Sequence, residues 1–202
     1  MSKLLEQVQI RVTDASISNE TIGGLTVISG EIIACDPLIP HHESFTKRIS
    51  PGVYPVILWW HKQEGRIAGA ELRLTEERPV RWEMATRAGQ DLSTLEPGHI
   101  YGYPVDAGLG CFADARAIRE MEQLEERLAR ELGDQFISFY DNKVEFILEE
   151  NDDNWGNLIV KEENGLNVIL FASGYGDGHY ASYWGIGEDG EPVTLVTDFN
   201  LF

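Results

Sequence analysis

The chain has 202 residues, 43% of them hydrophobic, and its 34 acidic against 16 basic side chains give a formal net charge of −18. This length and apolar content suffice for one core, so we expect a single domain over residues 1–202. The negative charge repels phosphate backbones and anionic lipid, which argues against nucleic acid and membrane as direct partners. Such acidity serves solubility, and it also fits a basic protein partner.

The two cysteines, Cys35 and Cys111, form neither a disulfide framework nor a CxxC metal pattern. The first eight residues lack the apolar run of a signal peptide, and no segment approaches the ~20 apolar residues of a membrane span. The cytoplasm is therefore the expected location. We also expect no cofactor, because the chain contains no P-loop, GxSxG or complete GxGxxG motif.

Alternating and β-branched residues predict strands through most of the chain. The predicted strands cover residues 8–12, 25–28, 31–34, 53–60, 67–74, 80–84 and 166–171. Ser29-Gly30 reads as a turn or bulge between the second and third strands. Pro37 and Pro40 lack the amide donor that regular pairing needs, so residues 36–52 are predicted to be irregular.

The middle strands differ in the faces that they are expected to bury. Residues 53–60 are almost continuously apolar, which suits a strand buried on both faces, although Pro55 indicates an edge position or a late start. Residues 67–74 and 80–84 alternate, so each should present one wet face. The three runs together resemble a meander.

One convincing helix is predicted after Cys111. Apolar residues recur every three or four positions from Ile118 to Leu132, and charged residues fill the other face. Asp114 is placed to cap the start of this helix and Gly133 to end it. We expect the apolar stripe to pack on a sheet. The acidic run Glu149–Asn154 is predicted to be a solvated loop, since it lacks the ligand spacing of an EF-hand.

Glycines organise the C-terminal part of the chain. Asp189-Gly190 separates two β-branched runs, which predicts a hairpin with a type I′ turn. Before it, Gly174, Gly176 and Gly178 permit backbone conformations that a β-carbon would forbid. Such a loop bends sharply or lets a ligand, a metal or another strand approach its backbone. The elements together predict an α+β fold, mainly antiparallel sheet or sandwich, with one principal helix packed on it.

Four segments in this order resemble a known family. They are SGEIIACDP at residues 29–37, PGVYPV at 51–56, YPVDAGLGCFAD at 103–114, and SGYGDGHY at 173–180 followed by the hairpin through Asp198-Phe199. From about residue 25 to the C-terminus the chain resembles the bacterial family called domain of unknown function 4241. The resemblance implies a soluble bacterial protein but no established chemistry. Family members resemble small acidic proteins found among toxin-immunity genes.

Five aspartates lie within these family-like segments: Asp36, Asp106, Asp114, Asp177 and Asp198. Carboxylates in such places can converge on magnesium or calcium or act as acid and base, and they can equally cap turns and helices. The residues predicted to line a binding site are Asp106, Gly174, Gly176, Asp177, Gly178 and Tyr180.

A metal site, if present, is predicted at Asp177, His179 and Asp198. The histidines show no HExxH or paired spacing, so zinc is a weak candidate. Cys111 stands just before the predicted helix, where amide donors and the helix dipole stabilise a thiolate. With His179 as base and Asp198 or Asp106 as the orienting group, Cys111 suggests a Cys-His-Asp hydrolase, although cysteine is more often a small buried hydrophobe.

The leading functional hypothesis is a non-enzymatic binding protein of toxin-immunity type. Its acidic surface would cover a basic protein toxin, because electrostatic complementarity speeds association. The alternative is a small hydrolase or metal-dependent enzyme that uses the glycine-rich loop and the segment from Asp106 to Asp114. The sequence leaves the oligomeric state open.

Overall fold

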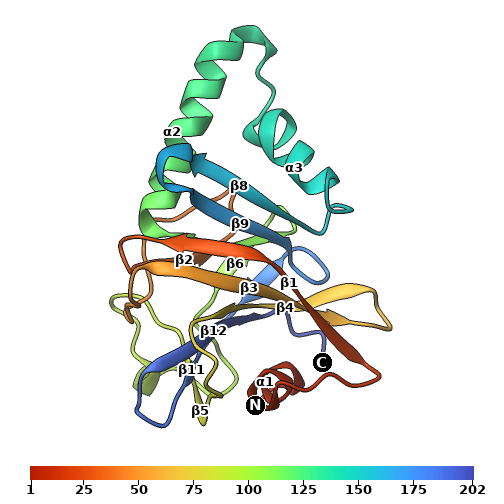
Figure 1. Cartoon of the computed structure of the whole chain (residues 1–202), viewed down its shortest axis with the longest axis vertical. Helices are drawn as coiled ribbons and strands as arrows, with labels where there is room; N and C mark the ends of the chain where they lie inside the picture. Colours follow the sequence, from red (N-terminus) through yellow and green to blue (C-terminus); the bar gives the residue numbers. More distant parts are fainter.

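The computed structural model describes residues 1–202 as two antiparallel sheets and a short ribbon, with helices on the outside (Figure 1). The strands are β1 (Ile17–Val27), β2 (Ile32–Cys35), β3 (Gly52–His61), β4 (Arg66–Arg73), β5 (Arg81–Met84), β6 (Tyr103–Val105), β7 (Leu109–Asp114), β8 (Trp155–Lys161), β9 (Leu166–Ala172), β10 (Gly178–Tyr180), β11 (Ser182–Ile186) and β12 (Pro192–Asp198). The larger sheet has six strands in the order β1-β3-β4-β12-β11-β5, and the smaller has four in the order β2-β7-β9-β8. Strands β6 and β10 form the ribbon.

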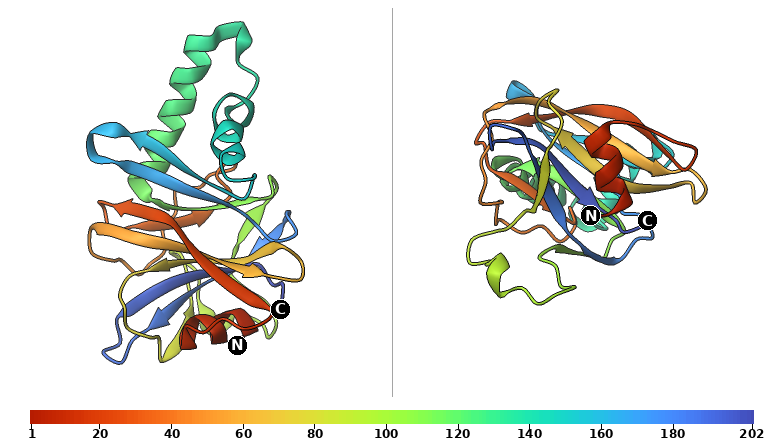
Figure 2. Two further views of the ribbon diagram at one scale, coloured as in Figure 1. Left: turned by 45° about the vertical axis from the view of Figure 1, so that its right-hand side comes forward. Right: turned by 90° about the horizontal axis from the view of Figure 1, so that it is seen from below.

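The helices are α1 (Lys3–Ile10), α2 (Ala115–Leu132) and α3 (Glu145–Glu149), with a π-helix at Tyr140–Val144 that leads into α3. Short 3₁₀ turns lie at Leu92–Thr94, Gly133–Gln135 and Glu162–Asn164. Helix α1 lies below the six-stranded sheet, and α2 and α3 stand above the four-stranded one (Figure 2, left). None of the helices is both long and apolar enough for a membrane span.

Three apolar clusters show how these layers are held together. The largest joins the facing sides of the two sheets, with Leu58, Leu72 and Leu195 from the larger sheet and Phe112 and Phe171 from the smaller. A second cluster fills the space between the smaller sheet and α2, and a third lies between α1 and the larger sheet. The predicted α+β fold, mainly antiparallel with one principal helix packed on a sheet, is confirmed.

Helix α2 begins and ends where its sequence indicates. The Asp114 carboxylate accepts a hydrogen bond from the amide of Arg116 at 2.8 Å, and Gly133 ends the helix with a φ of 54°. Ile118 and Met121 are buried, and Leu124 and Leu128 pack at the margin of the same core. The predicted caps and the predicted packing of the apolar stripe are therefore confirmed.

Residues 8–12, predicted to be a strand, belong instead to the end of α1 and the turn after it. Ser2 caps α1 by accepting a hydrogen bond from the Leu5 amide at 3.3 Å. Leu4, Leu5 and Val8 share one buried face of this helix. The helical spacing of these apolar residues decides the conformation, because it lets α1 cover the outer face of the larger sheet.

The predicted meander is correct only for β3 and β4, which are adjacent. Strand β5 pairs with β11 at the sheet edge, so β12 and β11 separate it from β4. Strand β4 also lacks the predicted wet face, because both of its faces are covered. Glu71, on that face, is 1% exposed and accepts hydrogen bonds from Trp59 at 2.9 Å and Arg73 at 3.0 Å.

Strand β3 lies between β1 and β4, so the edge position that Pro55 indicated is wrong. Pro55 lies opposite Gly24 of β1, but β4 pairs with β3 only from Val56 onward. The alternative prediction, a late start of the strand, is wrong as well, because β3 begins at Gly52 and only its pairing with β4 begins after Pro55. The proline lies where no partner on the β4 side requires an amide donor.

The predicted hairpin at Asp189-Gly190 exists, but its turn is of another type. A type I′ turn needs positive φ at both central residues, and only Gly190 has it, at 88°. The Gly187 amide donates to the Glu191 carbonyl at 2.9 Å, and the Gly190 amide to the Gly187 carbonyl at 3.1 Å. These bonds define a three-residue loop with a glycine bulge, which joins β11 to β12.

Replacement of Asp114 with Ala should cost about 3 kcal/mol of unfolding free energy, because the buried carboxylate accepts four hydrogen bonds, from Ile28, Ser29 and Arg116, that the variant loses. Urea denaturation measures the loss. Asp91→Ala provides the matched control, since Asp91 caps a 3₁₀ turn through the Ser93 amide at 2.8 Å in an exposed position. The Asp91→Ala variant should lose clearly less unfolding free energy. Equal losses in the two variants would contradict a special role for burial at Asp114.

Candidate functional site

Three of the four family-like segments meet in one set of loops at the end of the β6-β10 ribbon, whereas the segment at 51–56 begins β3. Asp36 is 1% exposed, and its Oδ2 accepts hydrogen bonds from the amides of Asp106 at 3.0 Å and Ala107 at 2.9 Å. Its Oδ1 accepts from the Leu38 amide at 2.9 Å. The Asp36 carboxylate is therefore an acceptor for backbone amides that joins two loops.

The glycine-rich loop is tied to the same place. The Ser173 amide donates to the Gly108 carbonyl at 3.0 Å, and the Ser173 hydroxyl donates to the Gly176 carbonyl at 3.0 Å. The buried Tyr180 hydroxyl donates to that carbonyl as well, at 2.9 Å. We call residues 36–38, 106–108 and 173–176 the motif loops. The polar groups of the motif loops are hydrogen-bonded to one another.

The predicted conformations of the glycines are partly confirmed. Gly174 and Gly176 have φ values of 62° and 104°, whereas Gly178 does not have a positive φ. Gly178 has a different constraint, because an added Cβ would lie 2.8 Å from the Tyr180 ring. The side chains of Asp106 and Asp177 point outward and are exposed.

Cys111 lacks the setting of a catalytic nucleophile. Its side chain is fully buried, and its Sγ lies 3.6 Å from the Sγ of Cys35 on the paired strand β2. The hydrogen bond to Cys35 and burial raise the pKa of the Cys111 thiol well above its ordinary value. Catalysis would require a lowered pKa and access to substrate, so the predicted nucleophile is instead a buried core residue.

Asp177, His179 and Asp198 do not form the predicted metal site. Asp198 is 4% exposed and accepts a hydrogen bond from the Asn200 amide at 2.9 Å, and burial raises the pKa of its carboxyl. Asp177 and His179 lie exposed on the loop and the ribbon. The structure contains no group of three His, Cys, Asp or Glu side chains placed to hold a metal ion. The predicted Cys-His-Asp set is not assembled either, since the thiol is enclosed in the α2-side core and His179 is exposed.

A buried cation lies beside the motif loops. Arg87 is 7% exposed, and its guanidinium donates to the carbonyls of Ala34 at 3.0 Å and Gly102 at 3.2 Å. It lies 5.4 Å from the centre of the Phe45 ring. Burial, followed by the charge of Arg87, lowers the pKa of the neighbouring His41 to about 4. No pattern in the sequence predicts that Arg87 and His41 lie together.

An exposed hollow of about 320 Å³ lies where β1, β3, β8 and the turn before β8 meet. It is lined by two tryptophans, three carboxylates and two asparagines: Trp60, Trp155, Glu20, Glu150, Asp152, Asn151 and Asn154. No basic side chain lines it, and none of its carboxylates takes part in an ion pair within the chain. We call it the tryptophan hollow.

The wall of the tryptophan hollow has a fixed shape. Trp60 Nε1 donates to the Glu20 carboxylate at 3.0 Å across the β1-β3 pair. Asp152 and Asp153 have left-handed φ values of 52° and 60°, and the Asp153 amide donates to the Leu148 carbonyl at 3.0 Å. The acidic run predicted to be a solvated loop is indeed exposed, but it is a tight, hydrogen-bonded turn.

The tryptophan hollow has the chemistry of a cation site. Indole faces attract ammonium and guanidinium groups, and carboxylates pair with them. A lysine or arginine side chain from another molecule would meet both kinds of group here. The one local signal for this site in the sequence is that Trp155 directly follows the acidic run, whereas Trp60 and Glu20 come from distant strands.

The fold and these surfaces define an acidic α+β protein of two packed sheets with a hollow lined by tryptophans and carboxylates. The family model described as Protein of unknown function (DUF4241) matches residues 25–197, and the chain belongs to this family. The resemblance inferred from the four segments is thereby confirmed. No curated protein and no solved structure shows a detectable match to the chain.

Replacement of Gly176 with Val should lower the free energy of unfolding by about 2 kcal/mol, because a β-branched residue is strongly disfavoured at a φ of 104°. This loss exceeds the ~1 kcal/mol of a simple propensity effect. No other atom crowds the position apart from a distant Gly108 Cα, so the loss would report backbone conformation. Thermal and urea unfolding measure it. A loss no larger than the propensity effect would mean that the loop can change its conformation at little cost.

Acidification should destabilise the protein through His41. Its folded pKa of about 4 lies below the unfolded value of ~6.5, so between these values the unfolded chain binds a proton that the folded chain does not. The contribution of His41 is fully present above pH ~6.5 and is lost as the pH falls toward 4. His41→Gln should flatten this part of the stability profile, as measured by urea denaturation at several pH values. Parallel profiles of the two proteins would refute the assignment.

Proposed function

We propose that this chain is a non-enzymatic binding protein of toxin-immunity type that covers a basic protein toxin. The observation that carries the proposal is the tryptophan hollow, which combines two partly buried indoles with three unpaired carboxylates. Its chemistry suits one lysine or arginine side chain of the partner. A few anchor residues, among which tryptophan is enriched, supply most of the binding energy in protein interfaces.

The shape of the hollow supports tight binding. Trp60 and Trp155 project from β3 and β8, whose backbones are fixed by sheet hydrogen bonds. A preformed site loses less conformational entropy on binding than a flexible loop does. A cation over an indole contributes about 0.5–1 kcal/mol at an exposed site and about 2 kcal/mol when water is excluded. The hollow would therefore act as an anchor within a larger contact.

The charge of the whole chain supports the same partner class. A formal charge of −18 attracts a basic protein over distances near the Debye length of ~8 Å at physiological salt. Long-range attraction raises the association rate, and the hollow would then hold one cationic side chain in place. The two effects can be measured separately, because long-range attraction changes the association rate and the hollow changes the dissociation rate.

Capture of the partner by the full-length chain, followed by a growth assay, tests the proposed function. The captured protein, when expressed alone, should arrest growth, and coexpression of this chain should restore it. A variant with Trp60→Ala and Trp155→Ala should restore growth less well. A captured protein that is harmless to cells, or complete protection by the folded double variant, would refute the proposal.

Neutralisation of two hollow carboxylates should weaken the complex more than neutralisation of two neighbours. Glu150→Gln with Asp152→Asn removes two charges that line the hollow. Glu149→Gln with Asp153→Asn removes two charges from the same run outside it and serves as the control. Both pairs should lower the association rate, most at low salt, whereas only the first should raise the dissociation rate.

Surface plasmon resonance against the captured partner at two salt concentrations separates these effects. We expect about a tenfold increase in the dissociation rate for the first pair, equivalent to roughly 1.4 kcal/mol. An equal dissociation rate for the two pairs would remove the hollow as the anchor and leave only steering by the acidic surface.

A further inference from the structure

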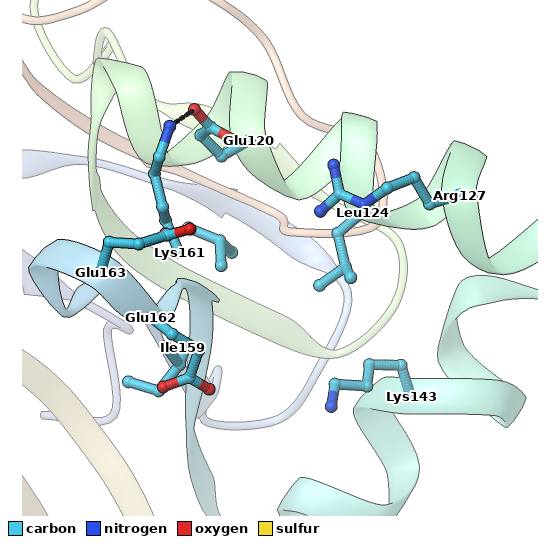
Figure 3. A pocket seen from close by; sticks show the side chains of 9 residues that line it. Glu120, Leu124, Arg127, Lys143, Ile159, Lys161, Glu162 and Glu163 are labelled. Carbon is cyan, nitrogen blue, oxygen red and sulfur yellow. Dashed lines mark hydrogen bonds and ion pairs between the residues drawn. The ribbon is translucent and has the colours of Figure 1, made fainter.

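A second hollow, of about 480 Å³, lies between α2, β8 and the π-helix. Its floor is apolar and consists of Leu124, Ile159 and Val160, and charged side chains surround it: Glu120, Arg127, Lys143, Lys161, Glu162 and Glu163. Figure 3 shows Leu124 pointing down from α2 and Lys143 extending toward the centre from the opposite side. We call it the α2/β8 cleft. Its volume lies within the range of small-molecule sites.

The charges around the cleft are not all neutralised within the chain. Lys161 Nζ lies 2.9 Å from the Glu120 carboxylate, and this contact raises the pKa of Lys161. Arg127 and Lys143 take part in no ion pair or side-chain hydrogen bond, although acidic residues outnumber basic ones twofold in this chain. Glu162 and Glu163 likewise take part in no ion pair, so two free cations lie on one side of the apolar floor and two free carboxylates on the other.

The backbone that carries Lys143 is unusual. Tyr140–Val144 is a π-helix, a rare conformation that occurs frequently at functional sites. Val144, beside Lys143, is fully buried in the core beneath α2 and holds the turn in place. Lys143 thus projects from an anchored turn, whereas the Arg127 side chain lies along α2, on the other side of Leu124 from Lys143 (Figure 3).

We propose that the α2/β8 cleft binds a small organic monocarboxylate. The carboxylate lies between Arg127 and Lys143, whose flexible side chains turn toward it and donate charge-assisted hydrogen bonds. The apolar part of the ligand covers Leu124 and Ile159. Glu162 and Glu163 on the other side disfavour a second negative charge, so the site selects a monoanion over a phosphate dianion or a nucleotide.

An NMR titration of the ¹⁵N-labelled full-length chain with phenylacetate at low salt tests the proposal. Phenylacetate should shift the backbone amides of Leu124, Lys143 and Ile159 saturably. The uncharged isostere phenylacetamide should bind at least about tenfold more weakly, and so should phenyl phosphate. No saturable shift with phenylacetate, or equal binding of phenylacetamide, would overturn the proposal. Tighter binding of phenyl phosphate would overturn the assignment to monocarboxylates.

Two variants separate the site from general electrostatics. Arg127→Gln with Lys143→Gln should weaken phenylacetate binding about tenfold or more, since both cations that contact the carboxylate are lost. Arg130→Gln removes a positive charge one turn further along α2, outside the cleft, and should leave the affinity unchanged. The amide spectra show whether each variant is folded. Unchanged affinity in the folded double variant, or an equal loss in Arg130→Gln, would refute the site.

Discussion

Two buried carboxylates on backbone amides hold the smaller sheet in register, and the rest of the molecule is built on that sheet. Strands β2 and β7 pair with Ile32 opposite Asp114 and Cys35 opposite Cys111. Asp114 ends β7, and its Oδ2 accepts the amides of Ile28 at 2.8 Å and Ser29 at 2.7 Å, just before β2. Asp36 follows β2 and accepts the amides just before β7. Each strand therefore ends in a carboxylate that binds the chain entering the other. A slip in register would leave both charges buried without donors, which costs several kcal/mol.

This reciprocal arrangement explains why the segments that looked most functional do not form a reactive site. Short side chains beside glycine suit a metal site, and they suit amide-binding turns equally well. Here Asp36, Asp114 and Ser173 are hydrogen-bonded to backbone groups. Asp106, Asp177 and His179 are exposed but line no hollow, and the two hollows with free charged groups lie in parts of the chain that the sequence marks as ordinary. These are the acidic turn before β8 and the polar side of α2.

The features that could be predicted from the sequence are those that depend on local periodicity and on local helix caps. Helix α2 is specified by its apolar stripe, by Asp114 and by Gly133, so its limits could be read directly. The position of β5 could not, because its partner β11 is about a hundred residues away and a propensity pattern carries no pairing information. The burial of Glu71, which the alternating pattern of residues 67–74 places on a solvent-exposed face, could not be predicted for a related reason. It depends on Trp59 and Thr194 from two neighbouring strands. The tryptophan hollow is likewise formed only by pairing of distant segments, so composition around Trp155 gives a hint and no more.

In the smaller sheet, the two buried carboxylates lie at the β2 edge, and both proposed sites lie at the β8 edge. The carboxylates of Asp36 and Asp114 hold β2 and β7 at one side, and β8 lies at the other. Trp155 at the start of β8 lines the tryptophan hollow, and Ile159 to Lys161 near its end line the α2/β8 cleft. One seven-residue strand thus contributes to a proposed cation site at one end and a proposed anion site at the other. Edge strands need protection by charge or by covering elements, and the charged residues beside β8 that suit this purpose are also those on which the two proposed sites depend. Because β9 connects β8 to β7, the β8 part of both surfaces rests on a backbone held in place by sheet hydrogen bonds.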